Sequence, residues 1–154
     1  MNHLVIFTDG GCSGNPGPGG WAYCLVDDAG TLLEERWGAE PQTTNNRMEL
    51  SATVAALTRV LERSEFQGLP ITLYTDSQYV QKGISEWIQA WKNRGWRTSN
   101  KEPVKNRDLW EELDRLNSLL VISWRWVKGH AGNPYNERVD RLTQEAIKSL
   151  GDAV

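Results

Sequence analysis

Two separate apolar runs of the chain each end in the dipeptide Thr-Asp. The first is LVIFTDGG, residues 4–11, and the second is ITLYTDSQ, residues 71–78. Their β-branched and aromatic residues are typical of strands, so Asp9 and Asp76 stand where two strands finish. If these strands are parallel neighbours, both carboxylates emerge at one edge of the sheet, where α/β proteins collect their ligands.

Two more acidic residues belong to predicted helices. Glu49 falls in the first turn of a helix that starts near residue 45, and Asp140 falls inside the last predicted helix. Each of the four acids also has an ordinary structural interpretation. These are a turn residue for Asp9, a helix N-cap for Asp76, a capping-box partner of Asn46 for Glu49, and a solvent-facing acid for Asp140.

Taken together, the four acids indicate a metal site. Carboxylates within a few ångströms repel one another and raise each other's pKa, unless divalent cations lie between them. Oxygen ligands favour Mg²⁺ or Mn²⁺ over zinc, and two such ions roughly 3.5–4 Å apart are a recurring device for phosphodiester cleavage. His130, in a glycine-flanked loop, is either simply exposed or moves protons beside such a site.

The bulk composition predicts one globular domain. The chain has 154 residues, 39% of them hydrophobic and 24% charged, and no apolar run reaches the roughly 18 residues that span a membrane. Its first residues lack the pattern of a signal peptide. Cys12 and Cys24 have neither zinc-site nor disulfide-framework spacing, so we expect a reducing cytoplasm.

Basic residues gather in one segment, although the formal net charge is −3. Residues 92–107 hold six Lys and Arg against Glu102 alone, which gives this segment +5 and the rest of the chain −8. The segment is either an anion-binding patch or a solvated loop. Trp87 and Trp91 precede it, one helical turn apart, as core residues or as an aromatic ledge for a nucleic-acid strand.

Hydrophobic periodicity predicts a mixed α/β sheet with helices on both faces. We expect strands at residues 3–8, 21–27, 32–38, 71–76 and 121–127, and helices at 45–64, 78–92, roughly 106–117 and after Pro134. The glycine-rich residues 10–20 should form a loop whose N–H groups approach phosphates or sugar hydroxyls. The motifs GxxxxGK[ST], HExxH and GxSxG are absent from the sequence.

Five motifs then carry a resemblance to a known family. They are TDGGCSGNPGPGG, TTNNRMEL, YTDSQYV, KNRDLWEELD and WVKGHAGNPYNERVDRL. From about residue 4 to 148, the chain resembles type 1 ribonucleases H of the bacterial single-domain form. The resemblance implies one catalytic domain over residues 1–154, frayed from about 150, with a five-stranded mixed sheet in the order 3-2-1-4-5 flanked by helices and a basic handle at about 87–107. It implies a monomeric cytoplasmic endonuclease that cuts the RNA strand of RNA–DNA hybrids, leaving 3′-hydroxyl and 5′-phosphate ends.

The resemblance also assigns roles to single residues. It implies two Mg²⁺ ions, replaceable by Mn²⁺, on Asp9, Glu49, Asp76 and Asp140, with His130 assisting proton transfer and product release. Contacts to the RNA strand fall on Cys12, Asn15, Asn45 and Gln78, and a DNA phosphate pocket falls on Thr44 and Asn46. The handle would grip the DNA strand through Trp87, Trp91, Lys92, Arg94 and Lys105.

The chain departs from the family pattern in a few places. Gly11 stands where serine or alanine is common, Asn133 and Tyr135 alter the segment after the histidine, and the acidic body predicts weaker, strongly salt-sensitive hybrid binding. Three alternatives remain. A non-catalytic hybrid-binding module should lose metal ligands, an integrase-like DNA nuclease should lack the handle, and a nucleotide-binding enzyme should carry a phosphate-loop lysine.

Overall fold

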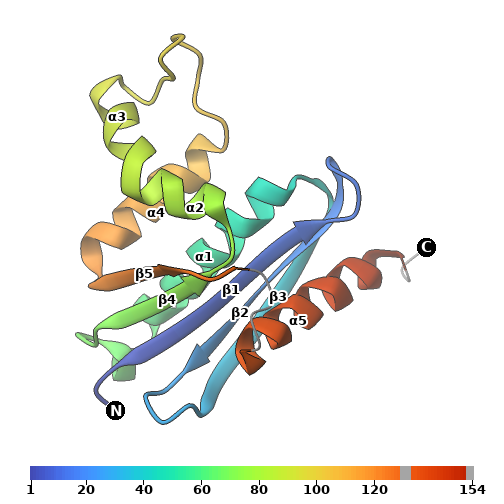
Figure 1. Ribbon diagram of the computed structural model, residues 1–154, viewed down its shortest axis with the longest axis vertical. Coiled ribbons are helices and arrows are strands. Elements are labelled where there is room, and N and C mark those ends of the chain that lie inside the picture. The colour runs from blue at the N-terminus through green and yellow to red at the C-terminus, as the bar shows by residue number, and fades with distance from the viewer. Residues whose placement is uncertain (129–132, 152–154) are drawn as a thin grey trace.

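A five-stranded mixed sheet forms the centre of the structure, a computed structural model that describes residues 1–128 and 133–151 (Figure 1). The spatial order is β3-β2-β1-β4-β5, so the expected order is confirmed. β1 pairs antiparallel with β2 and parallel with β4, which places the ends of the two Thr-Asp strands side by side. The strands are β1 Leu4–Cys12, β2 Gly17–Val26, β3 Leu32–Thr43, β4 Ile71–Thr75 and β5 Ile122–Trp126.

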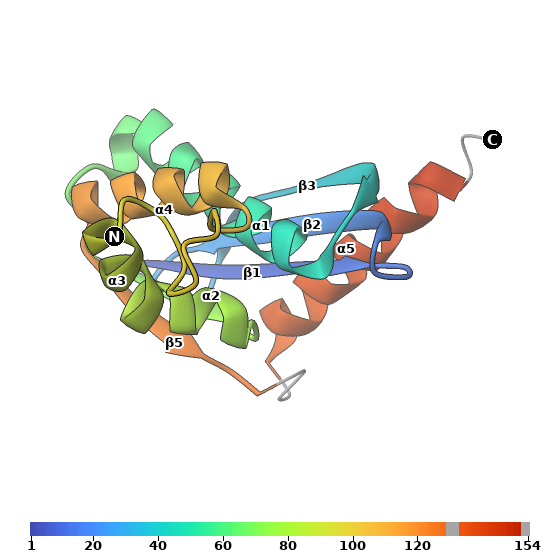
Figure 2. The ribbon, with the colours of Figure 1, turned by 90° about the horizontal axis from the view of Figure 1, so that it is seen from above.

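Helices cover both faces of this sheet. Figure 2 shows α1 and α4 on one face and α5 across the other. The larger core joins the first face of the sheet to α1 and α4, through residues such as Ile6, Leu57 and Trp110. The smaller core joins β1 and β2 to α5 through Phe7 and Val139. The helices are α1 Asn45–Glu62, α2 Gln78–Lys82, α3 Ile88–Asn93, α4 Arg107–Leu119 and α5 Pro134–Gly151, with a 3₁₀ turn at Ser64–Phe66.

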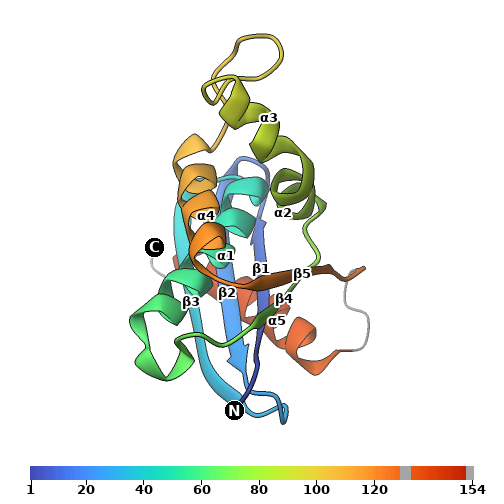
Figure 3. The ribbon, with the colours of Figure 1, turned by 90° about the vertical axis from the view of Figure 1, so that its left-hand side faces the viewer.

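The predicted helix at residues 78–92 is broken by a π-helical turn. The turn, Gly83–Trp87, lies between α2 and α3. Gly83 packs against α4 so closely that a Cβ there would lie 1.9 Å from the Trp110 ring. A π turn adds a residue to the helix at such a contact. Together α2, α3 and the following loop form a protrusion beyond the end of the sheet (Figure 3).

The glycine-rich segment is mostly strand, so the loop expected at residues 10–20 is wrong except at its centre. β1 continues to Cys12 and β2 begins at Gly17, with Gly11 paired to Gly20. The absence of side chains lets both helical layers approach the sheet. A Cβ on Gly10 would lie 2.4 Å from the Met48 carbonyl carbon, and one on Gly20 would lie 2.9 Å from a carbonyl oxygen of α5. These close approaches carry α1 and α5 toward Asp9.

Among the residues that the structure describes, no helix is both long enough and apolar enough to cross a membrane.

Candidate active site

The structure rules out several of the ordinary interpretations of the four acids. Asp9 lies within β1, paired with Ala22, so it is not a turn residue. Asp76 does not cap α2, because the Ser77 hydroxyl accepts the hydrogen bond from the Val80 amide at 3.0 Å. The side chain that caps α1 is likewise not Asn46.

Thr44 is the residue that caps α1. Its hydroxyl accepts a hydrogen bond from the Arg47 amide at 3.2 Å. Glu49 therefore sits one turn inside the helix and is not part of a capping box with Asn46. Asp140 is partly buried on α5, so it is not a fully solvent-facing acid. Neither carboxylate is needed to stabilise a helix end in these positions.

Asp9 is the electrostatic centre of the group. The pKa of Asp9 is raised to about 8, first by burial and then by the nearby Asp76, Asp140 and Glu49, while a contact with the Thr143 hydroxyl opposes the rise. A carboxyl in this setting binds a proton at neutral pH, because its charge is neither hydrated nor balanced by a cation. This strand position therefore has strong affinity for positive charge.

Glu49 is perturbed in the same direction. The pKa of Glu49 is raised to about 7, mainly by burial and also by Asp76, while a hydrogen bond from Ser77 opposes the rise. The Ser77 hydroxyl donates that bond to Glu49 Oε2 at 2.5 Å, and the same oxygen caps α2. Ser77 thus joins the carboxylate of α1 to the segment that follows β4. The sequence analysis did not identify Ser77 as a candidate site residue.

The first turns of α5, which carry Asp140, are fixed to the edge of the sheet. The Arg138 guanidinium donates to Glu35 on β3, at 2.8 Å from Nη2, and its Nε donates to the same carboxylate. The Tyr135 hydroxyl donates to the Gly30 carbonyl oxygen at 2.6 Å, and the Asn133 side chain accepts from the Tyr135 amide at 2.8 Å. Asn133 and Tyr135, two of the departures from the family pattern, therefore anchor this helix.

The donor set fits a hard divalent cation. Four carboxylates reach one region from β1, α1, the end of β4 and α5, and oxygen ligands of this kind suit Mg²⁺ and Mn²⁺. Within residues 1–128 and 133–151, no three acidic, histidine or cysteine side chains already stand as a complete ligand set. Like charges repel one another, and bound cations would draw the carboxylates together.

A groove at the start of α1 is lined by part of the expected substrate-binding residues. It has a volume of about 920 Å³ and runs between the β1–β2 turn, the start of α1 and the loop after α3. Five residues expected to bind substrate line it: Asn15, Thr44, Asn46, Trp91 and Lys105. Asn15 Oδ1 also accepts from the Asn45 amide at 3.2 Å, which joins the turn to α1.

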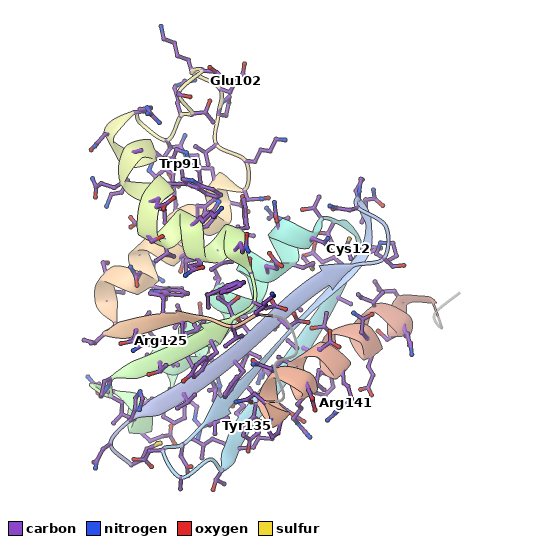
Figure 4. All side chains as sticks on the ribbon, viewed as in Figure 1. Cys12, Trp91, Glu102, Arg125, Tyr135 and Arg141 are labelled. Atoms are coloured by element: carbon purple, nitrogen blue, oxygen red, sulfur yellow. The ribbon has the colours of Figure 1, made fainter. Side chains whose placement is uncertain are left out.

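Other predicted contact residues lie outside this groove. The Cys12 thiol lies close to the carbonyl oxygens of Gly17 and Thr43, at 3.2 and 3.3 Å, and so belongs to the β1–β2 turn. Gln78 is exposed at the start of α2, next to the acidic group. Figure 4 shows Cys12 at the far end of β1 and Trp91 between α3 and α4.

Side chains that the sequence analysis missed hold the groove in shape. Arg47 forms a bidentate ion pair with Asp108, at 2.6 and 3.0 Å, which joins α1 to α4. Asn106, with φ at 59°, donates to the Tyr79 hydroxyl at 3.2 Å, and the Trp110 indole donates to the same oxygen at 3.0 Å. Such contacts join residues 27 to 61 positions apart, so local pattern could not reveal them.

The handle, residues 87–107, combines an aromatic interior with a charged surface. The Trp91 ring lies 5.8 Å from Trp87 and 5.4 Å from Trp110, so Trp91 packs among aromatic rings, and it also lines the groove. Its contact with a nucleic-acid strand stays a prediction. Lys92 pairs with Asp114 at 3.2 Å, whereas Arg94 and Lys105 have no ion pair within the described residues. Their charges are therefore the more available to an anion.

His130, expected to move protons, lies outside the described residues.

The comparisons with known proteins agree with this fold. A mixed sheet of this order, with one acid on β1 and another directly after β4, has the ribonuclease H fold. The crystal structure of LC9-RNase H1, "a type 1 RNase H with the type 2 active-site motif", superposes with a TM-score of 0.81 at 31% identity, covering 97% of this chain and 74% of that one. LC11-RNase H1 in complex with RNA/DNA hybrid, 24% identical with a TM-score of 0.71, covers 96% and 98% of the two chains and shares the fold.

Sequence relatives identify the family. The RNase H family model matches residues 1–148. Ribonuclease H of Nitrosomonas eutropha is 55% identical over 152 residues, which cover 97% of this chain and 93% of that protein. Ribonuclease H of Cupriavidus necator is 54% identical over 151 residues, covering 98% and 99%. This chain belongs to the ribonuclease H family.

Proposed function

We propose that the chain is a monomeric cytoplasmic endonuclease with one catalytic domain, and that it hydrolyses the RNA strand of RNA–DNA hybrids to 3′-hydroxyl and 5′-phosphate ends. The observation that carries this proposal is the gathering of three carboxylates around that of Asp9, together with a groove lined by residues such as Asn46 and Lys105. Relatives more than 50% identical are ribonucleases H, and a fold relative has been solved with an RNA/DNA hybrid.

The carboxylates of Asp9, Glu49, Asp76 and Asp140 would hold two Mg²⁺ ions, with Mn²⁺ able to replace them. Bound there, these cations would supply Lewis acidity for the attacking water and the leaving oxygen. The contribution of the chain itself is to hold these carboxylates in position. β1 and β4 present two ligands from a rigid sheet, and Ser77 orients Glu49 through its 2.5 Å hydrogen bond. We assign His130 the transfer of a proton in this reaction.

The groove would hold the DNA strand. Thr44 and Asn46, at the positive end of α1, and Lys105 across the groove would bind its phosphates, while Asn15, Cys12 and Gln78 would lie nearer the RNA. The 2′-hydroxyl distinguishes RNA from DNA at such contacts. The handle cations, Lys92 and Arg94 among them, would add sequence-independent affinity.

The test is cleavage of end-labelled substrates at matched salt. The wild type with Mg²⁺ should cut only the RNA of the hybrid, and neither single-stranded RNA, double-stranded RNA nor DNA. EDTA and Asp9→Asn should each abolish cutting. Glu62→Gln removes one exposed carboxylate at the end of α1, away from the site, and should cut like the wild type.

Hybrid binding that persists without cutting in Mg²⁺ or Mn²⁺ would instead support a non-catalytic hybrid-binding module. Cutting of duplex DNA would support an integrase-like nuclease.

A further inference from the structure

Thr143 is a fully buried hydroxyl that the fold alone does not require. It lies on α5, one turn beyond Asp140, and it is 0% exposed. Its Oγ1 makes no hydrogen bond of standard geometry within the described residues. A buried hydroxyl without a partner costs stability relative to an apolar side chain of the same shape. A valine would fill this position at lower cost if packing were its only role.

Thr53 shows what a buried helical threonine normally does. It is also 0% exposed, but its hydroxyl donates to the backbone carbonyl oxygen of Glu49, four residues earlier, at 3.0 Å. That bond to the preceding turn is the usual solution inside a helix. Thr143 lacks it, so its side chain is turned away from its own helix and toward the sheet.

The neighbours of Thr143 on the sheet are Asp9 and Gly11. These two residues are two apart on β1 and therefore face α5 together. The methyl group of Thr143 lies 3.8 Å from the place where a Cβ of Gly11 would be. The hydroxyl is close enough to the Asp9 carboxyl to lower its pKa. Thr143 thus lies over this pair of residues, with its methyl toward the glycine and its oxygen toward the acid.

From this geometry we infer that Thr143 is a positioning residue for the metal site, whose hydroxyl donates to one oxygen of ionised Asp9 and so fixes the carboxylate for cation binding. The inference deepens the proposed function and rests on it. A hydrogen bond to the side of a ligating carboxylate that faces away from the cations restricts its rotation. The remaining lone pairs of the carboxylate stay available to the cations. Ser77 acts on Glu49 in the corresponding way, so two hydroxyls would orient two of the four ligands.

Hydrogen bonds to the residues that bind a metal contribute measurably to the affinity for that metal. Loss of one typically costs 10- to 100-fold in metal affinity or activity. Because Thr143 has no route to the groove residues, its effect should fall on kcat and on the Mg²⁺ requirement, with KM for the hybrid unchanged.

Four proteins separate the effect of the Thr143 hydroxyl from the effect of side-chain packing at this position. Wild type and Thr143→Val differ by a hydroxyl against a methyl group, while Thr143→Ser and Thr143→Ala differ by the hydroxyl alone. Each is assayed for hybrid cleavage across a Mg²⁺ titration, and Mn²⁺ binding is measured by calorimetry without substrate. Thermal denaturation in EDTA checks that each variant is folded.

The expected result is about a tenfold rise in the half-saturating Mg²⁺ concentration and in the Mn²⁺ dissociation constant for Thr143→Val and Thr143→Ala. Thr143→Ser should remain within about threefold of the wild type. In EDTA, Thr143→Val should be at least as stable as the wild type, because it removes an unpaired buried hydroxyl.

Equal metal affinity and kcat in wild type and Thr143→Val would overturn the inference, as would a loss shared equally by Ser, Ala and Val. Failure of the proposed function looks different, because the wild type itself would then show no metal-dependent cleavage.

Discussion

Replacing Asp9 by asparagine should stabilise the metal-free protein while it destroys the site. The pKa of Asp9 rises from its ordinary 3.8 to about 8, chiefly through burial. At pH 7 the native state therefore binds a proton that the unfolded chain has released. Asparagine resembles the protonated acid and needs no such uptake, so the variant avoids this cost.

The magnitude follows from the pH interval. Between pH 4 and 8 the native state holds more protons than the unfolded state, so stability falls as pH rises, by about 1.4 kcal/mol per unit for one group. Over the three units from pH 4 to 7 this amounts to about 4 kcal/mol. Relaxation of the other acids reduces the gain, so we expect Asp9→Asn to be more stable by about 2–4 kcal/mol at pH 7.

Urea denaturation in EDTA between pH 4.5 and 9 measures this effect. The difference between Asp9→Asn and wild type should be small at pH 4.5, grow steadily and level off above pH 8. Saturating Mg²⁺ should stabilise the wild type more than the variant, because the cation binds only the native ionised site. Glu62→Gln should show no pH-dependent difference. A constant or absent difference for Asp9→Asn would refute the view that Asp9 is a buried, unbalanced acid.

Three further predictions concern the frame around the site. Gly10→Ala should abolish activity and lower the melting temperature, because its Cβ would lie 2.4 Å from the backbone of α1; an active variant of native stability would contradict this. Arg47→Ala and Asp108→Ala should each cost about 0.5–1 kcal/mol, since the pair is half exposed, and should raise KM for the hybrid. The double variant should be no worse than either single one. Lys105→Ala should reduce the slope of log KM against log salt by about 1, whereas Lys148→Ala, in the last turn of α5, should leave it unchanged.

Sequence pattern was sufficient to predict the order of the strands and to single out the four acids as candidate ligands, because both depend on local signals. The apolar runs around Asp9 and Asp76 define strands by themselves, and the motifs that carry the family resemblance are long. The residues at which strands begin and end were harder to predict from the sequence. Glycine usually indicates a loop, but in residues 10–20 it lies in paired strands, because what matters there is the room it leaves for α1 and α5.

The supporting residues could not be found from sequence for a related reason. Ser77 and Thr143 each act on a carboxylate far away in the chain, and a hydroxyl carries no periodic signal. The buried side chains of α5 are Asn136, Val139, Thr143 and Ala146, and Leu142 packs partly buried against the smaller core. Only the approach of α5 to Gly11 and Gly20 decides which side of the helix faces the sheet.

The parallel pairing of β1 with β4 has a consequence for how the molecule folds. Phe7 pairs with Tyr74, so this contact closes a loop of more than 60 residues, and α5 docks from the far end of the chain. Non-local pairings of this kind are slow to form, and the four ligands meet only when the last of them is made. A cation that needs all four therefore binds after the rate-limiting step. It should slow unfolding while leaving the rate of folding almost unchanged.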